Sequence, residues 1–208
     1  METIAAIATP HGTGGVAVIR ISGEDAIARA GEVFVPVRGK TPSEMEGYTC
    51  AYGYILRDGE RLDDAVLTVF RAPHSYTGED VAELSCHGGR YLTEQVLRTV
   101  ICDRVRPAEP GEFTRRAFLN GKLSLMQAEA VADLISASGE NAMRAARSLR
   151  DGAAFRRIQG LSQTLLTLLS DLAVWADYPD EDIPAVENTQ LTSWSLHDIS
   201  TTTRSEER

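Results

Sequence analysis

Cysteine, positive charge and long apolar runs are all scarce in this sequence, and each shortage disfavours a class of protein. The three cysteines are too few and too far apart for a disulfide framework, and none has the Cys-x-x-Cys or Cys/His spacing of a zinc site. We therefore expect reduced thiols and no metal centre. The apolar runs are short and interrupted by charges, and the N-terminus lacks the basic start of a signal peptide. The sequence predicts a cytoplasmic protein without a membrane span.

The charge balance is acidic, with 21 lysines and arginines against 30 aspartates and glutamates, and a net charge of −9. Because such a chain repels a phosphate backbone, contact with nucleic acid would need a local basic patch or another domain. This balance disfavours a general nucleic-acid binder. With 208 residues, 43% of them hydrophobic, the chain can bury a core in one domain or in two of modest size.

The first residues read as two short strands separated by a glycine-rich loop. In the second expected strand, residues 17–22, the period of two places Ile19 and Ile21 on one face and Arg20 on the other. The glycines of the loop precede a strand, whereas a dinucleotide-binding fingerprint needs its glycines before a helix. The loop is therefore not interpreted as a phosphate-binding site.

Ser22 is expected to cap a helix that runs to about Val33, with Glu24 and Asp25 in its first turn. Residues 35–46 carry two prolines and little periodicity, so they are expected to form a connection.

A β-hairpin is the strongest local signal in the next segment. Residues 48–56 and 65–70 read as paired strands around the Asp-Gly turn at 58–59. A further strand is expected at residues 80–86, and its alternation sets Glu83 on the face opposite the apolar residues.

Other polar residues of this segment are interpreted as structural. Glu79 and Asp80 are adjacent, so they would point to opposite sides and make a poor acid–base pair; we expect them to cap a turn or lie exposed. His87 lies beside glycines without a second ligand or nucleophile near it in sequence, which favours a structural role. Cys86 is expected to be a small buried residue. No catalytic residue is assigned.

A short helix is expected to start near Glu112, which can pair with Arg116 one turn later. Asn120 and Gly121 predict a turn, and Lys122 is expected to be held on it before the next helix begins. The alternative interpretation is that Lys122 and the arginines at 115 and 116 form only a solvated face.

The second half of the chain reads as helices. A capping box at Ser124 and Gln127 begins one, and two apolar rows from Ile158 to Trp175 predict a long helix that must meet other helices in a bundle or a second subunit. Without such partners, the segment beyond about Leu123 is expected to pack back on the first domain, pair across a dimer, or expose apolar surface.

The pattern of elements predicts an α+β N-terminal domain followed by an α-helical segment. We assign residues 1–119 to the first domain, 120–190 to the first helices of the second, and 191–208, which are polar and aperiodic, to a disordered tail. The acidic residues at 180–182 are interpreted as a solvated turn because no patterned set of oxygen ligands surrounds them.

Several motifs in order resemble the N-terminal part of the tRNA modification GTPases called MnmE or TrmE. The resemblance covers roughly residues 1–183 and is carried by Ile7-Ala8-Thr9-Pro10, Gly14-Gly15-Val16-Ala17-Val18-Ile19-Arg20-Ile21-Ser22-Gly23, Ser75-Tyr76-Thr77-Gly78-Glu79-Asp80, His87-Gly88-Gly89, Pro110-Gly111-Glu112-Phe113, Arg116-Ala117-Phe118-Leu119-Asn120-Gly121-Lys122, Gln127-Ala128-Glu129-Ala130 and Asp177-Tyr178-Pro179-Asp180-Glu181.

The resemblance implies a first domain similar to the folate-binding aminomethyltransferase of glycine cleavage. Such a domain binds a one-carbon tetrahydrofolate such as 5-formyltetrahydrofolate and forms a homodimer, and the family's folate contacts fall on Arg20, Glu83 and Lys122. A carboxylate can accept hydrogen bonds from the donor-rich edge of a pterin, and either cation can pair with the carboxylates of a folate tail. Which cation meets which group stays open. The family works with a flavoprotein partner, MnmG, on the wobble uridine of tRNA.

The sequence also departs from the family, because it contains no Gly-x-x-x-x-Gly-Lys-Ser/Thr phosphate loop. GTP, potassium and magnesium are therefore expected only with a GTPase domain that this chain lacks. The resemblance also implies an incomplete α-helical domain, because the helices that complete the family's bundle follow the GTPase domain. We expect the helical pattern to stop after about Val186, as in a truncated or frame-shifted reading frame. Two alternatives stay open: a self-contained folate-dependent one-carbon transferase, which the absence of an obvious nucleophile or acid–base pair disfavours, and a non-catalytic dimerisation fragment. Whether the chain is an enzyme stays undecided.

Overall fold

The computed structural model describes residues 1–10 and 12–177. Contacts divide the chain into two units, Met1–Asp151 and Gly152–Arg208, which are described separately. In the described ranges, no helix combines the length and the apolar character that crossing a bilayer requires.

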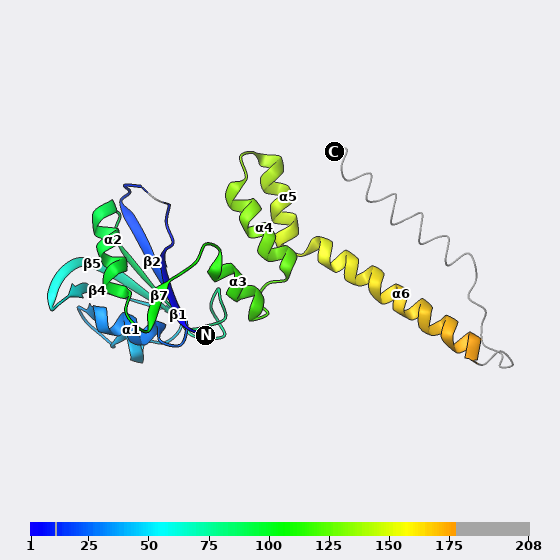
Figure 1. The fold of residues 1–208 in the computed structure, drawn as a ribbon, viewed down its shortest axis with the longest axis horizontal. Coiled ribbons are helices and arrows are strands. Elements are labelled where there is room, and N and C mark those ends of the chain that lie inside the picture. Colours follow the sequence, from blue (N-terminus) through cyan, green and yellow to red (C-terminus); the bar gives the residue numbers. More distant parts are fainter. Residues whose placement is uncertain (11, 178–208) are drawn as a thin grey trace. The chain divides into compact units, whose positions relative to one another are not determined.

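The first unit is built on one mixed sheet of seven strands in the order β3-β4-β5-β6-β2-β1-β7 (Figure 1). All neighbouring strands are antiparallel except β1 and β7, which are parallel. The strands are β1 (Thr3–Ile7), β2 (Val16–Ser22), β3 (Phe34–Pro36), β4 (Thr49–Arg57), β5 (Glu60–Phe70), β6 (Val81–His87) and β7 (Val105–Pro107).

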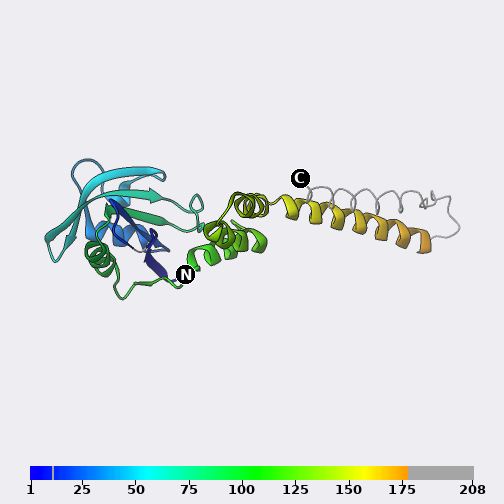
Figure 2. The same ribbon diagram turned by 90° about the horizontal axis from the view of Figure 1, so that it is seen from above.

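Two helices, α1 (Ala26–Val33) and α2 (Arg90–Val100), cover one face of this sheet (Figure 1; Figure 2). The core lies between them and the sheet, and its side chains are those that the alternation of β2, β5 and β6 predicts. The fully buried members include Ile19, Ile21, Leu67, Leu84, Val96 and Val100. The prediction of an α+β domain is confirmed, and the opposite face, which we call the open face, carries Arg20 and Glu83.

The expected helix cap at Ser22 is wrong. Ser22 is the last residue of β2 and is fully buried, and its hydroxyl lies 2.7 Å from Thr77 Oγ1 and donates to Glu79 Oε2 at 2.8 Å. Helix α1 begins only at Ala26, after Asp25 as N-cap. Strand pairing with β6 and the hydrogen bonds of the Ser22 hydroxyl with Thr77 and Glu79 outweigh the local capping preference, which is worth about 1 kcal/mol.

Most other local expectations of the first unit are confirmed with small changes. The hairpin turns at Asp58 and Gly59, but β5 starts directly after the turn at Glu60. The expected connection at 35–46 begins with the short edge strand β3, and a 3₁₀ turn, η1 (Pro42–Glu44), lies within it. Helix α3 (Glu112–Leu119) starts after Gly111, whose φ is 73°.

Two further helices complete the first unit, α4 (Leu125–Ser136) and α5 (Glu140–Arg150), and the capping box that opens α4 is present. Their burial is slight: Ala130 and Ala146 are their buried residues, whereas Leu125 is 56% and Ile135 is 83% exposed. In the single chain these two helices therefore leave apolar side chains exposed, and whether a second subunit covers them stays open.

Helix α6 (Ala153–Asp177) belongs to the second unit. Apolar residues along it are exposed, among them Ile158, Leu161, Leu165 and Leu172. The expectations for the acidic turn at 180–182 and for a tail at 191–208 lie outside the described residues, as does the side chain of Trp175.

A candidate ligand site on the open face

The centre of the candidate site is an ion pair between two neighbouring strands. Arg20 on β2 lies directly opposite Glu83 on β6, and Arg20 Nε donates to Glu83 Oε1 at 2.7 Å. The two side chains are 28% and 22% exposed, so both functional groups stay accessible on a half-buried surface. Strand alternation alone predicts the face on which each residue lies, and the register between β2 and β6 brings the two together.

Two aromatic rings flank the arginine. The guanidinium carbon of Arg20 lies 5.5 Å from the ring centroid of Tyr76 and 5.6 Å from that of Phe113, both within the range of cation–π attraction. The hydroxyl of Tyr76 lies 2.9 Å from Thr114 Oγ1, which joins the loop before β6 to helix α3. Arg20 is therefore held in position by charge on one side and by aromatic rings on the others.

Lys122 reaches the same loop by another route. It follows the left-handed turn at Gly121 (φ 69°), and its Nζ donates to the backbone carbonyl of Pro73 at 3.1 Å. Gly78 has a φ of 79°, and a Cβ on it would lie 3.2 Å from Lys122 Cγ, so both its backbone conformation and the close approach of the lysine stem favour glycine. The structure thus brings Arg20 and Glu83 into direct contact and places Lys122 against the loop that carries Tyr76.

A buried network of charges fixes helix α3 and this loop. Arg116, whose side chain is 4% exposed, donates to Glu112 Oε1 at 3.0 Å, to Glu79 at 3.1 Å and to the backbone carbonyl of Glu2 at 2.7 Å. The predicted pairing of Glu112 with Arg116 is confirmed. The expectation that Glu79 is exposed or caps a turn is wrong, and Arg116 does not belong to a solvated face.

Glu112 accepts more hydrogen bonds than the other carboxylates of this network. Its side chain is 1% exposed, and it accepts two hydrogen bonds from Arg106 and one from the backbone N–H of Glu109. These hydrogen bonds lower the pKa of Glu112 to about 2, and those from Arg106 have the largest effect. Because Glu112 is next to Phe113 and Glu79 lies three residues after Tyr76, the network positions both aromatic neighbours of Arg20.

Two other groups that could be considered reactive are accounted for by the structure. His87 Nδ1 lies 2.8 Å from Asp63 Oδ1, and the backbone N–H of His87 donates to the other carboxylate oxygen at 2.9 Å. The hydrogen bond to Asp63 raises the pKa of His87 above its ordinary value. Cys86 is buried as predicted, and burial raises the pKa of its thiol to about 11, which keeps it protonated near neutral pH.

Within residues 1–10 and 12–177, no cluster of three or more histidines, cysteines, aspartates or glutamates has a geometry that could hold a metal ion. The aromatic members of the site, Tyr76 and Phe113, were not assigned from the sequence. Both stand in motifs that carry the family resemblance, and this was the only signal that could have singled them out.

Comparison with known proteins defines the class of this site. The family model described as "GTP-binding protein TrmE N-terminus" matches residues 3–122, more than half of the chain and every residue of the open-face site. A second model, "MnmE helical domain", matches residues 125–205. The chain therefore belongs to the MnmE (TrmE) family of tRNA modification GTPases.

The relatives bear the same name. The chain is similar to the tRNA modification GTPase MnmE of Acholeplasma laidlawii, with 42% identity over 199 residues that cover 95% of this chain and 44% of the relative. For Moorella thermoacetica the identity is 47% over 182 residues, covering 86% and 39%. For Thermus thermophilus it is 45% over 188 residues, covering 89% and 43%.

The chain spans about two-fifths of the length of these relatives. The match to the helical domain continues to residue 205, so the expected loss of the family's pattern after about Val186 is wrong.

Proposed function

We propose that this chain binds a one-carbon tetrahydrofolate, such as 5-formyltetrahydrofolate, on the open face of its sheet through Arg20, Glu83 and Lys122. In this proposal it is the folate-binding and dimerisation portion of a tRNA modification GTPase that takes part in the carboxymethylaminomethyl modification of the wobble uridine. The observation that carries the proposal is the accessible Arg20–Glu83 pair between the rings of Tyr76 and Phe113.

The residues fit the chemistry of a reduced folate. A pterin presents several N–H donors along one edge, which the carboxylate of Glu83 can accept, and its flat ring suits a surface walled by aromatic side chains. The tail carries carboxylates that pair with arginine or lysine, and both Arg20 and Lys122 lie along the segment that includes Tyr76. The similarity of the fold to the aminomethyltransferase of glycine cleavage is part of the same proposal.

The folate site is tested by calorimetric titration with 5-formyltetrahydrofolate. We expect Glu83→Ala and Arg20→Ala each to weaken binding by about 1 to 3 kcal/mol, because each leaves a polar group of the ligand or of its partner residue unpaired. The matched controls are Glu94→Ala and Arg98→Ala on α2, which remove the same charges from the other side of the sheet and should leave the affinity unchanged. Unchanged affinity in both site variants would remove the assignment.

Dimerisation is supported by apolar side chains on the open face. Val16 on β2 is 62% exposed and Val66 on β5 is 38% exposed, and exposed apolar surface beside polar residues is typical of interaction sites. We expect a concentration-dependent dimer in sedimentation experiments, and Val66→Glu should shift it toward monomer. Tyr91→Glu is the control, because Tyr91 is 76% exposed on α2, on the other side of the sheet. A monomer at every concentration would contradict the homodimer.

The remaining assignments concern the full protein. We propose that a cytoplasmic complex with the flavoprotein MnmG modifies tRNA, and that GTP, potassium and magnesium are bound by sequence outside this chain, because no phosphate-loop motif occurs within it. We further propose that residues 1–119 form the folate domain and that the first helices of the helical domain begin at residue 120.

A further inference from the structure

A contact between two hydroxyl groups beside the open-face site departs from the pattern of the other helices. Thr114 lies on α3, and its Oγ1 is 2.9 Å from the hydroxyl of Tyr76, 38 residues away in the sequence. A threonine within a helix usually donates to the backbone carbonyl four residues earlier. In the described helices, the other threonines all do so: Thr93, Thr99, Thr164 and Thr167. The hydroxyl of Thr114 instead joins its helix to the loop before β6.

The backbone that carries Tyr76 is fixed independently of this contact. The next residue, Thr77, is fully buried, and its hydroxyl lies 2.7 Å from that of Ser22. The carbonyl of Thr77 accepts a hydrogen bond of 2.7 Å from Asn120 Nδ2. Tyr76 itself is 39% exposed, so its ring could turn about its side-chain bonds if only the backbone were held. The contact with Thr114 therefore fixes the far end of an exposed ring.

The ring that is held in this way is one of the two that flank Arg20. The guanidinium carbon of Arg20 lies 5.5 Å from the ring centroid of Tyr76. It lies 5.6 Å from the centroid of Phe113, which directly precedes Thr114 in the sequence. Adjacent residues of α3 thus supply one aromatic ring and hold the other. A ring that is in place before a ligand arrives loses less conformational freedom when the ligand binds.

We propose that Thr114 is a positioning residue of the open-face ligand site, which holds the ring of Tyr76 beside Arg20 in the orientation that receives a folate. This inference rests on the proposed folate function and adds to it a residue that acts through Tyr76. Loss of the contact should weaken folate binding roughly three- to tenfold, the range expected when binding must itself immobilise one further side chain.

Calorimetric titration of the full chain with 5-formyltetrahydrofolate tests this role. Thr114→Val keeps the shape of the side chain and removes its hydroxyl, so it should weaken binding roughly three- to tenfold. Thr114→Ser keeps the hydroxyl and should bind about as tightly as the unchanged chain. Tyr76→Phe keeps the ring and removes the same contact, so it should weaken binding by a similar factor.

The double variant Tyr76→Phe/Thr114→Val separates positioning from a general loss of structure. Both substitutions break one and the same contact, so the double variant should bind about as well as either single variant. Two independent effects would instead multiply. Thermal melts of all three variants should match that of the unchanged chain, because water can replace the partner of an exposed hydroxyl.

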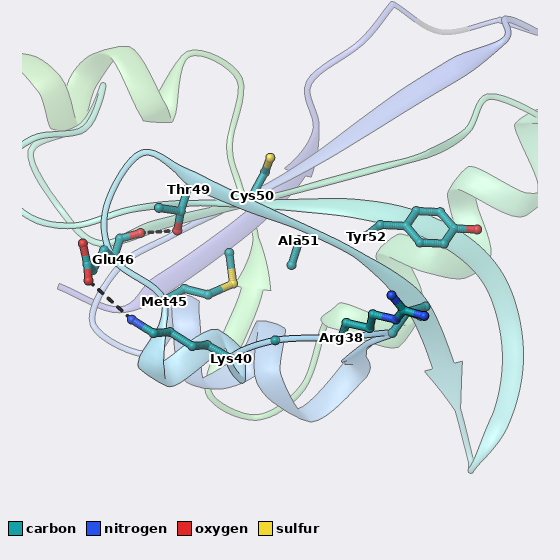
Figure 3. A pocket seen from close by; sticks show the side chains of 10 residues that line it. Arg38, Lys40, Met45, Glu46, Thr49, Cys50, Ala51 and Tyr52 are labelled. Carbon is teal, nitrogen blue, oxygen red and sulfur yellow. Dashed lines mark hydrogen bonds and ion pairs between the residues drawn. The ribbon is translucent and has the colours of Figure 1, made fainter.

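Tyr52→Phe and Thr99→Val are the matched controls. Tyr52 lies on β4, beside a hollow of about 530 Å³ whose lining shares no residue with the folate site (Figure 3). Its hydroxyl donates to Asp64 Oδ2 at 2.7 Å, so Tyr52→Phe also removes a tyrosine hydroxyl that has a partner. Thr99→Val removes a threonine hydroxyl from α2, on the other side of the sheet. Neither control should change folate affinity.

Three results would overturn the positioning role. They are a Thr114→Val variant that binds folate as tightly as the controls, a Thr114→Ser variant as weak as Thr114→Val, and single effects that multiply in the double variant. In each of these cases the folate site itself still stands if the unchanged chain binds 5-formyltetrahydrofolate and Arg20→Ala weakens that binding. If the unchanged chain does not bind the ligand, the proposed function fails and the role of Thr114 fails with it.

Discussion

Replacing Arg116 with methionine should lower the free energy of unfolding by about 3 to 5 kcal/mol, the range for breaking a buried ion pair by removal of one partner. The substitution leaves Glu112 and Glu79 with fewer donors at sites that are 1% and 13% exposed. It also releases the carbonyl of Glu2, which Arg116 holds at 2.7 Å. Urea unfolding followed by circular dichroism measures the change.

Arg115→Met is the matched control, because Arg115 lies on the same helix, carries the same charge, is 57% exposed and reaches Glu112 only at 3.6 Å. Its effect should stay within about 0.5 kcal/mol. The double variant Glu112→Gln/Arg116→Met should be less destabilised than the sum of the single variants, because the two side chains share a hydrogen bond. Equal effects of Arg115→Met and Arg116→Met would contradict the network.

Acid provides a second measurement of the same network. The pKa of Glu112 is lowered from 4.5 to about 2 in the folded chain, chiefly by its hydrogen bonds with Arg106. Its contribution to stability is therefore fully present above the unfolded value and is lost as the pH falls from about 4.5 through about 2. The loss amounts to about 3 kcal/mol, and Glu112→Gln should show less of it in urea unfolding over this range.

Gly23→Ala should destabilise the protein by about 3 to 5 kcal/mol, through backbone strain and steric overlap together. Gly23 has a φ of 134°, which residues with a Cβ rarely adopt. A Cβ there would lie 2.7 Å from Thr3 Cα and 2.6 Å from Thr3 Oγ1. The threonine cannot easily move, because its hydroxyl accepts a hydrogen bond from the backbone N–H of Asp25 at 3.0 Å. Thermal and urea unfolding measure the effect.

Gly15→Ala is the comparison for this substitution. Gly15 lies directly before β2, whereas Gly23 lies directly after it. The φ of Gly15 is outside the left-handed region, and a Cβ there would meet nothing within 4 Å. We expect a change within about 0.5 kcal/mol. If both alanine variants were equally stable, Gly23 would not be the constrained position that the close approach of β1 implies.

The faces of the strands could be predicted from the sequence because alternation is a local property. The side-chain directions of Arg20 and Glu83 follow from the apolar residues beside each of them, and both are confirmed. Their contact could not be derived in the same way, because it depends on the register between β2 and β6, which is set by pairing 63 residues apart.

The burial of Arg116 and Glu79 could not be predicted for a related reason. A charged residue on a short helix or in a loop is usually solvated, and only the approach of α3 to the loop before β6 reverses this. Ser22 illustrates the same limit, since its local sequence favours a helix cap while its hydroxyl partners lie 55 and 57 residues away. The family motifs include Ser22, Glu79 and Arg116, but the physical role of each residue could be recognised only from its tertiary contacts.

The link between Arg116 and the carbonyl of Glu2 joins residues that lie 114 positions apart, and β1 pairs in parallel with β7 close to the same point. During synthesis on the ribosome, β1 therefore emerges long before β7, its second partner strand, and before Arg116, which binds the carbonyl of Glu2. The nascent chain can form the β4–β5 hairpin early, but it cannot close the edge of the sheet until α3 has left the exit tunnel. The first strand to be translated is thus among the last to be secured.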